Sequence, residues 1–261
     1  MAHSSALPKI SIVTPSYNQA AFIERTIQSV LSQHYPNLEY IVIDGDSRDG
    51  TLQILESYKD QLRYISEPDK GQSDAINKGL RMTTGDIVAY LNSDDILQPE
   101  SLMAVGTFFA NHPDTQWVSG YSKIINENDE EISSYIRLYK NFLLRHYTTN
   151  MLLVINFISQ MSTFWRRSAM ERVGEFSVDQ HLVMDYDYWL RLQVCGQPGI
   201  IRRDLSCFRV HAGAKSSLRF VEQFRQSYLV ASRYIKQPWL RFASRLHNWL
   251  VVQVYRVGIS K

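Results

Sequence analysis

The chain has 261 residues, 44% of them hydrophobic, and a formal net charge of +2. A chain of this length and composition can bury a sizeable core, which excludes disordered and fibrous classes. No apolar run approaches the roughly 20 residues that span a bilayer, and the start, MAHSSALPK, lacks the apolar stretch of a secretory signal. We therefore expect a cytoplasmic protein, with peripheral binding to the inner face of the membrane left open. Cys195 and Cys207 have no CxxC spacing, so buried thiols are expected.

The charge is distributed unevenly along the chain. Residues 1–214 contain 19 basic and 25 acidic residues, for a net charge of −6. Residues 215–261 contain nine basic residues and one acid, for a net charge of +8. Two segments of opposite charge are expected to meet different partners. The basic residues of this tail are Lys215, Arg219, Arg225, Arg233, Lys236, Arg241, Arg245, Arg256 and Lys261.

Short apolar runs alternate with helical patterns through the first half of the chain. This alternation indicates βαβ units and therefore an α/β fold, with a single Rossmann-like, mostly parallel sheet flanked by helices. Beyond Trp117 the elements become longer and mixed, and Pro238 separates two helical patterns in the tail. We expect one domain over 1–214 and a helical appendage over 215–261. The expected strands are 10–14, 40–44, 64–65 and 87–91, and the expected helices are 20–33, 52–59, 73–82, one from about Pro99, and 186–194.

Polar residues follow each of the first four apolar runs. In an open parallel sheet the ligand lies beyond the carboxyl ends of the strands, so these segments are the candidates for a binding site. The first contains no glycine-rich turn, and GxxxxGK[ST] is absent from the chain, which disfavours the two commonest nucleotide-binding folds. The segments read TPSYN at 14–18, DGDS at 44–47, EPDKG at 67–71 and NSDD at 92–95.

Asp94 is the strongest metal-ligand candidate. It follows an apolar run and lies beside Asn92, Ser93 and Asp95, and its carboxylate oxygens suit Mg²⁺ or Mn²⁺. Carboxylates repel a diphosphate unless a cation bridges them, so the grouping fits a phosphorylated ligand together with a metal. The alternative is that these acids cap the helix beginning near Pro99, a role that Asp95 alone could fill.

Five segments in this order, TPSYN, IDGDSRDGT, EPDKGQSDAINKG, LNSDD and MDYDYWLRL, resemble the family 2 glycosyltransferases with the GT-A fold. The similarity covers about residues 9–216. It implies a nucleotide-sugar half over about 9–112 and an acceptor half over about 113–214. It also implies an inverting transfer from a nucleotide sugar, usually a UDP-sugar, to a saccharide or lipid-linked saccharide hydroxyl, in polysaccharide or cell-surface glycan synthesis.

The resemblance assigns the donor-site residues. Pro15 and Tyr17 would pack on the nucleobase and ribose, and Asp44 would bind the base; Tyr17 as a core aromatic is the alternative. The family often has a second acid where this chain has Gly45. Asn92, Ser93 and Asp94 correspond to the DxD motif, with Asp94 holding the metal and Asn92 replacing an acid. Lys70 and Asp74 match a region that contacts phosphate or orients the loop, and they also fit a solvated turn.

The resemblance makes Asp185 the general base, because MDYDYWLRL resembles a segment that usually reads Glu-Asp-x-Asp. Met184 replaces the usual first acid, and Asp187, two residues away, stays open as the base. Helix capping is the alternative for both aspartates. His211, in FRVHAGAKS, matches a histidine that adds a metal or diphosphate contact in some GT-A enzymes, although a single histidine is often structural.

Two other functions remain open: a nucleotide-sugar or glycan-binding module without turnover, and a nucleotidyltransferase. The expected cofactor is Mn²⁺ or Mg²⁺, no nucleic-acid partner is expected, and a homodimer is left open. The tail combines apolar residues at helical spacing with arginines. This pattern fits binding to an anionic membrane surface, and it equally fits packing on the rest of the protein or on a second subunit.

Overall fold

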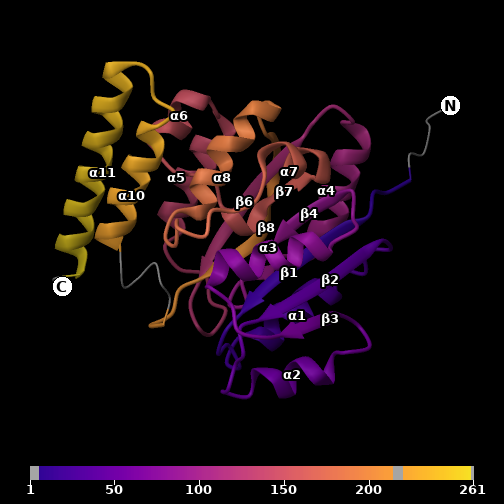
Figure 1. The fold of residues 1–261 in the computed structure, drawn as a ribbon. Coiled ribbons are helices and arrows are strands. Elements are labelled where there is room, and N and C mark those ends of the chain that lie inside the picture. The colour runs from indigo at the N-terminus through magenta and orange to yellow at the C-terminus, as the bar shows by residue number, and fades with distance from the viewer. Residues whose placement is uncertain (1–5, 214–219, 260–261) are drawn as a thin grey trace.

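The computed structural model describes residues 6–213 and 220–259, with side chains described as far as residue 253 and not for Phe220. Their strands form one eight-stranded sheet of order β3-β2-β1-β4-β7-β6-β8-β5. Helices flank it, and two long helices, α10 and α11, close the chain on one side (Figure 1). The strands are β1 Ile10–Ser16, β2 Leu38–Asp44, β3 Arg63–Ser66, β4 Ile87–Tyr90, β5 Ile96–Leu97, β6 Trp117–Ile125, β7 Thr163–Arg166 and β8 Gly199–Arg209.

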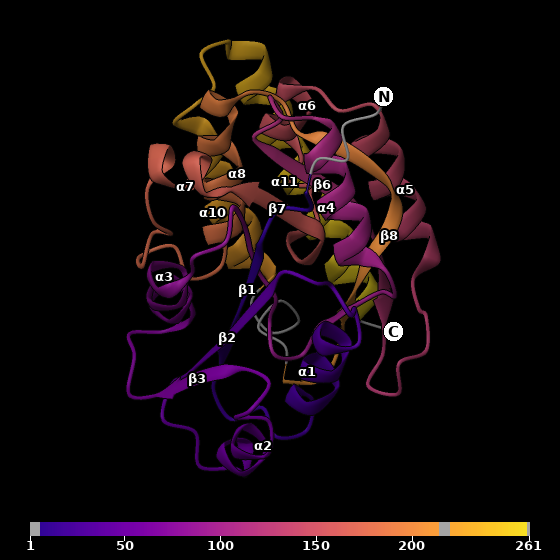
Figure 2. The same cartoon turned by 90° about the vertical axis from the view of Figure 1, so that its right-hand side faces the viewer.

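The helices follow the predicted alternation in the first half of the chain. α3 packs on β1 and β2, α5 packs on β6, and α4 packs on β8. Figure 2 shows β1 to β3 with α1 and α2 at one end of the molecule and α4 to α8 toward the other. The helices are α1 Ile23–Leu31, α2 Thr51–Ser57, α3 Gln72–Met82, α4 Ser101–Asn111, α5 Ser134–Arg145, α6 Thr149–Val154, α7 Arg167–Val173, α8 Met184–Leu192, α10 Phe220–Ser232 and α11 Pro238–Ile259, with 3-10 turns η1 Gln160–Ser162 and η2 Gln193–Cys195.

The parallel half of the sheet aligns the strand ends. β1 pairs in parallel with β2 and β4, and β2 pairs in parallel with β3. Ser16 lies opposite Asp44, and Asp44 lies opposite Ser66, so three strands end at the same level. The polar segments that follow these strands are therefore neighbours, as the alternating pattern predicts.

The second half of the sheet is mixed. β7 runs antiparallel to β4 and to β6, while β8 runs parallel to β6 and antiparallel to β5. Because Ile96 pairs with Cys207, the chain just before β5 lies beside the chain just after β8. This pairing brings the segment of Asp94 next to the segment of His211.

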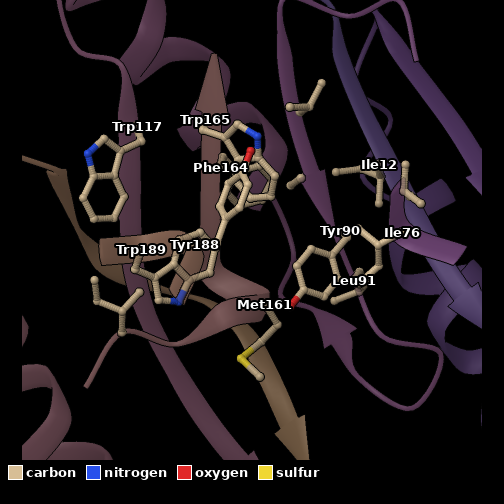
Figure 3. Packing of buried hydrophobic residues seen from close by; sticks show 14 of the residues in the cluster. Ile12, Ile76, Tyr90, Leu91, Trp117, Met161, Phe164, Trp165, Tyr188 and Trp189 are labelled. Carbon is tan, nitrogen blue, oxygen red and sulfur yellow. The ribbon is translucent and has the colours of Figure 1, made fainter. Parts of the chain in front are cut away.

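A cluster of large aromatic residues fixes α8 on the sheet (Figure 3). Trp189 of α8 stacks on Trp117 of β6 at a centroid distance of 6.2 Å, and Tyr188 stacks on Phe176 at 3.9 Å. Trp165 of β7 contacts both α8 residues at 5.3 to 5.7 Å. Truncating a buried tryptophan of this kind costs about 3–5 kcal/mol. The start of α8, which carries Asp185, is thereby held rigidly at the sheet.

The C-terminal helices pack as a pair on helices of the second half of the chain. α10 contacts α6 and α8, and α11 contacts α6 and α10. Val230, Ala231 and Ile235 are buried around the end of α10, and Leu240 is buried on α11. Among the described residues, no helix has both the length and the apolar composition needed to cross a bilayer. Lys215, Arg219, Arg256 and Lys261 of the basic tail have side chains outside the described part of the chain.

Candidate active site

Asp44 ends β2 and is fully buried. Its carboxylate accepts hydrogen bonds from the Ser47 backbone N–H at 2.9 Å, the Ser47 hydroxyl at 2.5 Å and the Ser66 hydroxyl at 2.7 Å. These bonds tie the loop after β2 to the end of β3. The structure places Asp44 at the strand end that the sequence predicts, with its oxygens engaged by protein donors.

Tyr17, Gly45 and Asp69 meet beside Asp44. Tyr17 is 63% exposed, so it is a surface aromatic and not part of the core. A Cβ atom on Gly45 would lie 2.8 Å from Asp69 Oδ2 and 3.3 Å from Tyr17 Cδ2, so glycine allows both side chains to approach. Pro15, by contrast, lies within buried β1. Sequence reasoning did not single out Asp69, although it lies in the quoted segment after β3.

Lys70 and Asp74 organise the start of α3. The Lys70 backbone N–H donates to Asp74 Oδ2 at 3.0 Å, and Lys78 Nζ lies 3.8 Å from the same oxygen. Lys78 also pairs with Glu67 at 2.8 Å. Asp74 thus holds the loop in place, which fits the loop-orienting role, while the Lys70 side chain is exposed.

Asn92 lies in a network of side-chain amides. Its Oδ1 accepts from Gln72 Nε2 at 2.7 Å, and its Nδ2 donates to Asp95 Oδ2 at 3.1 Å and to Gln160 Oε1 at 3.3 Å. Gln160 in turn donates to the Tyr90 carbonyl at 2.7 Å. The amide of Asn92 both accepts and donates here, which a carboxylate could not do.

Buried side chains of Thr26 and Arg209 hold the loop of Ser93 and Asp94 through its backbone carbonyls. The Thr26 hydroxyl donates to the carbonyls of Ser93 and Asp95 at 2.9 and 2.7 Å. Arg209, fully buried on β8, donates from Nε to the Asp94 carbonyl at 2.8 Å. Sequence reasoning missed Arg209, although it stands two residues before His211 in the quoted FRVHAGAKS.

Asp94 and His211 are in contact although 117 residues separate them. His211 Nε2 lies 3.0 Å from Asp94 Oδ2, and the two side chains are 8% and 22% exposed. A Phe22 ring packs on His211 with centroids 4.6 Å apart. His211 is therefore part of the strand-end site and not an isolated core histidine.

Asp95 has a structural role distinct from that of Asp94. It is fully buried and accepts from the Arg209 backbone N–H at 2.9 Å. Burial, followed by the neighbouring charge of Asp94, raises the pKa of Asp95 well above its usual value. The cap position of α4 is occupied by Glu100, so helix capping explains neither aspartate.

The described residues contain no group of three or more His, Cys, Asp or Glu side chains that could hold a metal ion by themselves. Asp94 and His211 offer one oxygen and one nitrogen ligand, a donor pair compatible with Mn²⁺. Diphosphate oxygens and water would complete the coordination shell. The residues thus fit a cation shared between the protein and a phosphorylated ligand.

Asp185 and Asp187 occupy different environments in the first turn of α8. Asp187 pairs with Arg191 at 2.9 Å, and its side chain is only 9% exposed. Asp185 is half-buried and accepts from the Tyr186 N–H at 2.7 Å. Burial raises the pKa of Asp185, while the charge of Lys140 acts in the opposite direction. Asp187 is thus committed to an ion pair, which leaves Asp185 as the better candidate for a base.

The start of α3 links the two halves of the site. Gln72 Nε2 donates to Asn92 Oδ1 of the NSDD loop at 2.7 Å, and the neighbouring Ser73 contacts Met184 at the start of α8. Burial raises the pKa of Tyr90, at the end of β4, well above its usual value, and the charges of Asp185 and Asp95 act in the same direction. Met184, where the family has an acid, accepts a hydrogen bond on Sδ from the Ser73 hydroxyl at 2.8 Å.

A mixed sheet flanked by helices, with acids at its strand ends and a metal-compatible pair, fits the GT-A fold that the sequence predicts. The profile of Glycosyl transferase family 2 matches residues 11–174, more than half of the chain. The chain belongs to this family.

Three curated relatives carry glycosyltransferase names. An uncharacterized glycosyltransferase of Mycobacterium tuberculosis is 26% identical over 250 residues, 91% of this chain and 92% of that protein. An uncharacterized glycosyltransferase of Nostoc sp. is 34% identical over 128 residues, 48% of this chain and 39% of that one. The putative teichuronic acid biosynthesis glycosyltransferase TuaG of Bacillus subtilis is 37% identical over 119 residues, 44% of this chain and 47% of its own. The matches thus span less than half the length of the last two relatives.

Two solved structures share the fold. Mannosyltransferase PcManGT from Pyrobaculum calidifontis, in complex with GDP-Man and Mn²⁺, has a TM-score of 0.66 at 21% identity, covering 93% of this chain and 74% of that one. S. aureus TarS 1-349, in complex with UDP, has a TM-score of 0.65 at 19% identity, covering 85% and 65%. At this identity the likeness establishes the fold.

Proposed function

We propose that the protein transfers a hexosyl or N-acetylhexosaminyl group from a UDP-sugar to a saccharide hydroxyl, with inversion at the anomeric carbon. The observation that carries the proposal is the contact of His211 with Asp94, in a loop that the first residues of α3 connect to the start of α8 through Gln72 and Ser73. The candidate cation-binding pair and the candidate base are thus held at the same end of α3. The proposed acceptor is a glycan or a lipid-linked saccharide, in polysaccharide or cell-surface glycan synthesis. The relative TuaG is named for teichuronic acid biosynthesis, which supports this choice.

The donor would be held on the nucleotide side of the site. Exposed Tyr17 offers a ring face to the nucleobase, and Asp69, brought close by Gly45, is an acceptor for a base N–H. Asp44 supports this surface from within through its bonds to Ser47 and Ser66. Asp94 and His211 would hold Mn²⁺ or Mg²⁺, and such an ion neutralises charge on a departing diphosphate.

Asp185 would act as the general base. Its carboxylate takes the proton of the acceptor hydroxyl while the hydroxyl oxygen forms a bond to the anomeric carbon. The bond from that carbon to the diphosphate oxygen breaks, and the electron pair leaves with the nucleoside diphosphate. A pKa raised by burial moves a carboxylate toward the working pH, which makes it a more effective base.

The test is a product analysis with a panel of nucleotide sugars and saccharide acceptors, with Mn²⁺ and with chelator. Release of nucleoside diphosphate that depends on the acceptor and the ion is the expected result. Pyrophosphate release would indicate a nucleotidyltransferase instead. A raised melting temperature with donor but no product across the acceptor panel would indicate a binding module.

A further inference from the structure

One face of α11 consists of large apolar side chains exposed to solvent. Trp239, Phe242, Leu246, Trp249 and Leu250 are between 43% and 68% exposed. They follow one another at intervals of three and four residues, with Leu250 next to Trp249, so they share one side of the helix. Isolated exposed apolar residues are ordinary, whereas a contiguous stripe with two tryptophans marks an interaction surface.

The opposite side of α11 is anchored to the protein. Leu240 and Ser244 are buried, and α11 packs on α6 and α10 (Figure 1). Val230 and Ala231 of α10 are buried, and α10 packs between α11 and α8. Of the two tail helices, α10 also leaves Val221 and Leu229 exposed, and α11 presents its longer apolar stripe to solvent.

Arginines flank the exposed stripe. Arg241 and Arg245 are exposed and lie one turn apart, and Arg245 is three residues from Phe242 and four from Trp249. Arg241 also donates to the carbonyl of Ile235, in the turn before α11, at 3.0 Å. α11 contains no acidic residue, and Glu222 is the one acid in the last 47 residues of the chain.

This combination fits a lipid surface better than a protein. Apolar residues with tryptophans on one side, cationic residues along the edge and the absence of acids are the features of helices that lie in a membrane interface. α11 is long enough for a bilayer, yet its arginines make it too polar to cross one. It is therefore suited to lie flat, with its apolar stripe among acyl chains and its arginines at headgroup phosphates.

We propose that the exposed face of α11 docks the protein on an anionic lipid bilayer. The partner is a membrane surface rich in acidic phospholipid, and the docking holds whether or not the proposed transfer reaction is correct. Each arginine contributes roughly a fivefold gain in partitioning to anionic lipid, an attraction that salt screens.

The experiment uses the full chain in vesicle flotation, with phosphatidylcholine alone and with an equal mixture of phosphatidylcholine and phosphatidylglycerol. We expect binding to the mixed vesicles only, weakened by high salt. W239S/F242S/W249S should lose at least about tenfold in binding, and R241Q/R245Q about 30-fold. The matched control is Y135S/L138S/F142S on α5, which removes side chains of similar exposure and should bind like the wild type.

Three results would overturn the proposal. If both α11 variants bind vesicles like the wild type, the exposed face of α11 does not contact lipid. If the α5 control loses as much binding as the α11 variants, the effect is not specific to α11. A wild-type dimer that W239S/F242S/W249S converts to a monomer without changed flotation would make the face a subunit interface. Should that variant fail to fold, R241Q/R245Q, which keeps every apolar residue, decides the question.

Discussion

Asp185 and Asp187 stand two residues apart, and the structure predicts opposite consequences when each becomes asparagine. Asp185→Asn keeps the shape of the side chain and breaks no ion pair, so folding and donor binding should persist. The proposed general base is lost, however, and the rate of transfer should fall by at least about 10²-fold. Burial raises the pKa of Asp185 and so favours a neutral side chain, and the melting temperature should therefore not decrease.

Asp187→Asn should show the reverse pattern. It removes the partner of Arg191, whose Nε lies 2.9 Å from a carboxylate that is 9% exposed. Leaving that guanidinium partly buried without its counter-charge should cost about 2–3 kcal/mol. For a domain of this size this corresponds to a melting temperature lower by roughly 4–12 °C. The rate of transfer below the melting transition should stay within about threefold of the wild type.

Calorimetry and acceptor-dependent release of nucleoside diphosphate, measured on both variants, give the comparison. A large rate loss in Asp187→Asn with a normal rate in Asp185→Asn would place the base two residues further along α8. Normal rates in both variants would remove the base from this helix altogether.

Three further outcomes are expected. Asp94→Asn and His211→Ala should fold and should require at least about tenfold more Mn²⁺ for half-maximal transfer, since each removes one proposed metal ligand; an unchanged Mn²⁺ titration would refute the proposed metal site. Asn92→Asp, which restores the family acid, should lower stability by about 1–3 kcal/mol because it faces Asp95 and the Gln160 oxygen; a calorimetric gain would contradict this reading. Burial lowers the pKa of His247 in the folded protein below 6.5, so as the pH falls the unfolded chain takes up a proton at this residue before the folded protein does. The contribution of His247 to stability is therefore present above about pH 6.5 and is lost as the pH falls. His247→Gln should flatten the acid-side loss of stability measured by denaturation between about pH 8 and pH 5, and equal pH dependence in both proteins would exclude this role.

The sequence predicted the parts of the fold that repeat regularly. Alternating strands and helices place the carboxyl ends of β1, β2 and β4 together, so the sequence alone predicts that Asp44 and Asp94 lie at the same edge of the sheet. No periodic pattern predicts the pairing of β5 with β8, which brings His211 to Asp94, and the family resemblance implied a role for His211 without this pairing. Gln160 comes from a 3-10 turn and reaches Asn92 across 68 residues, a contact that no local pattern reveals.

The tail illustrates a second limit. Both helices carry apolar residues at helical spacing, and the pattern alone did not show which stripe the protein covers. Tertiary packing decides this: Ala231 and Ile235 are buried, whereas Trp239 and Phe242 face solvent. The packing interpretation therefore holds for the buried sides of both helices, while binding of the tail to an anionic membrane stays a prediction for the exposed side of α11.

Three departures from the family pattern share a physical explanation. Where the family resemblance implies acids, this chain has Gly45, Asn92 and Met184, and each meets a neighbour that an acid would disturb. A side chain at Gly45 would collide with Asp69, an acid at position 92 would face the Asp95 carboxylate, and an acid at 184 would displace the sulfur that accepts from Ser73. Together they reduce the negative charge around the strand ends by up to three. The diphosphate of the proposed donor would therefore meet less repulsion here than in a site with all three acids.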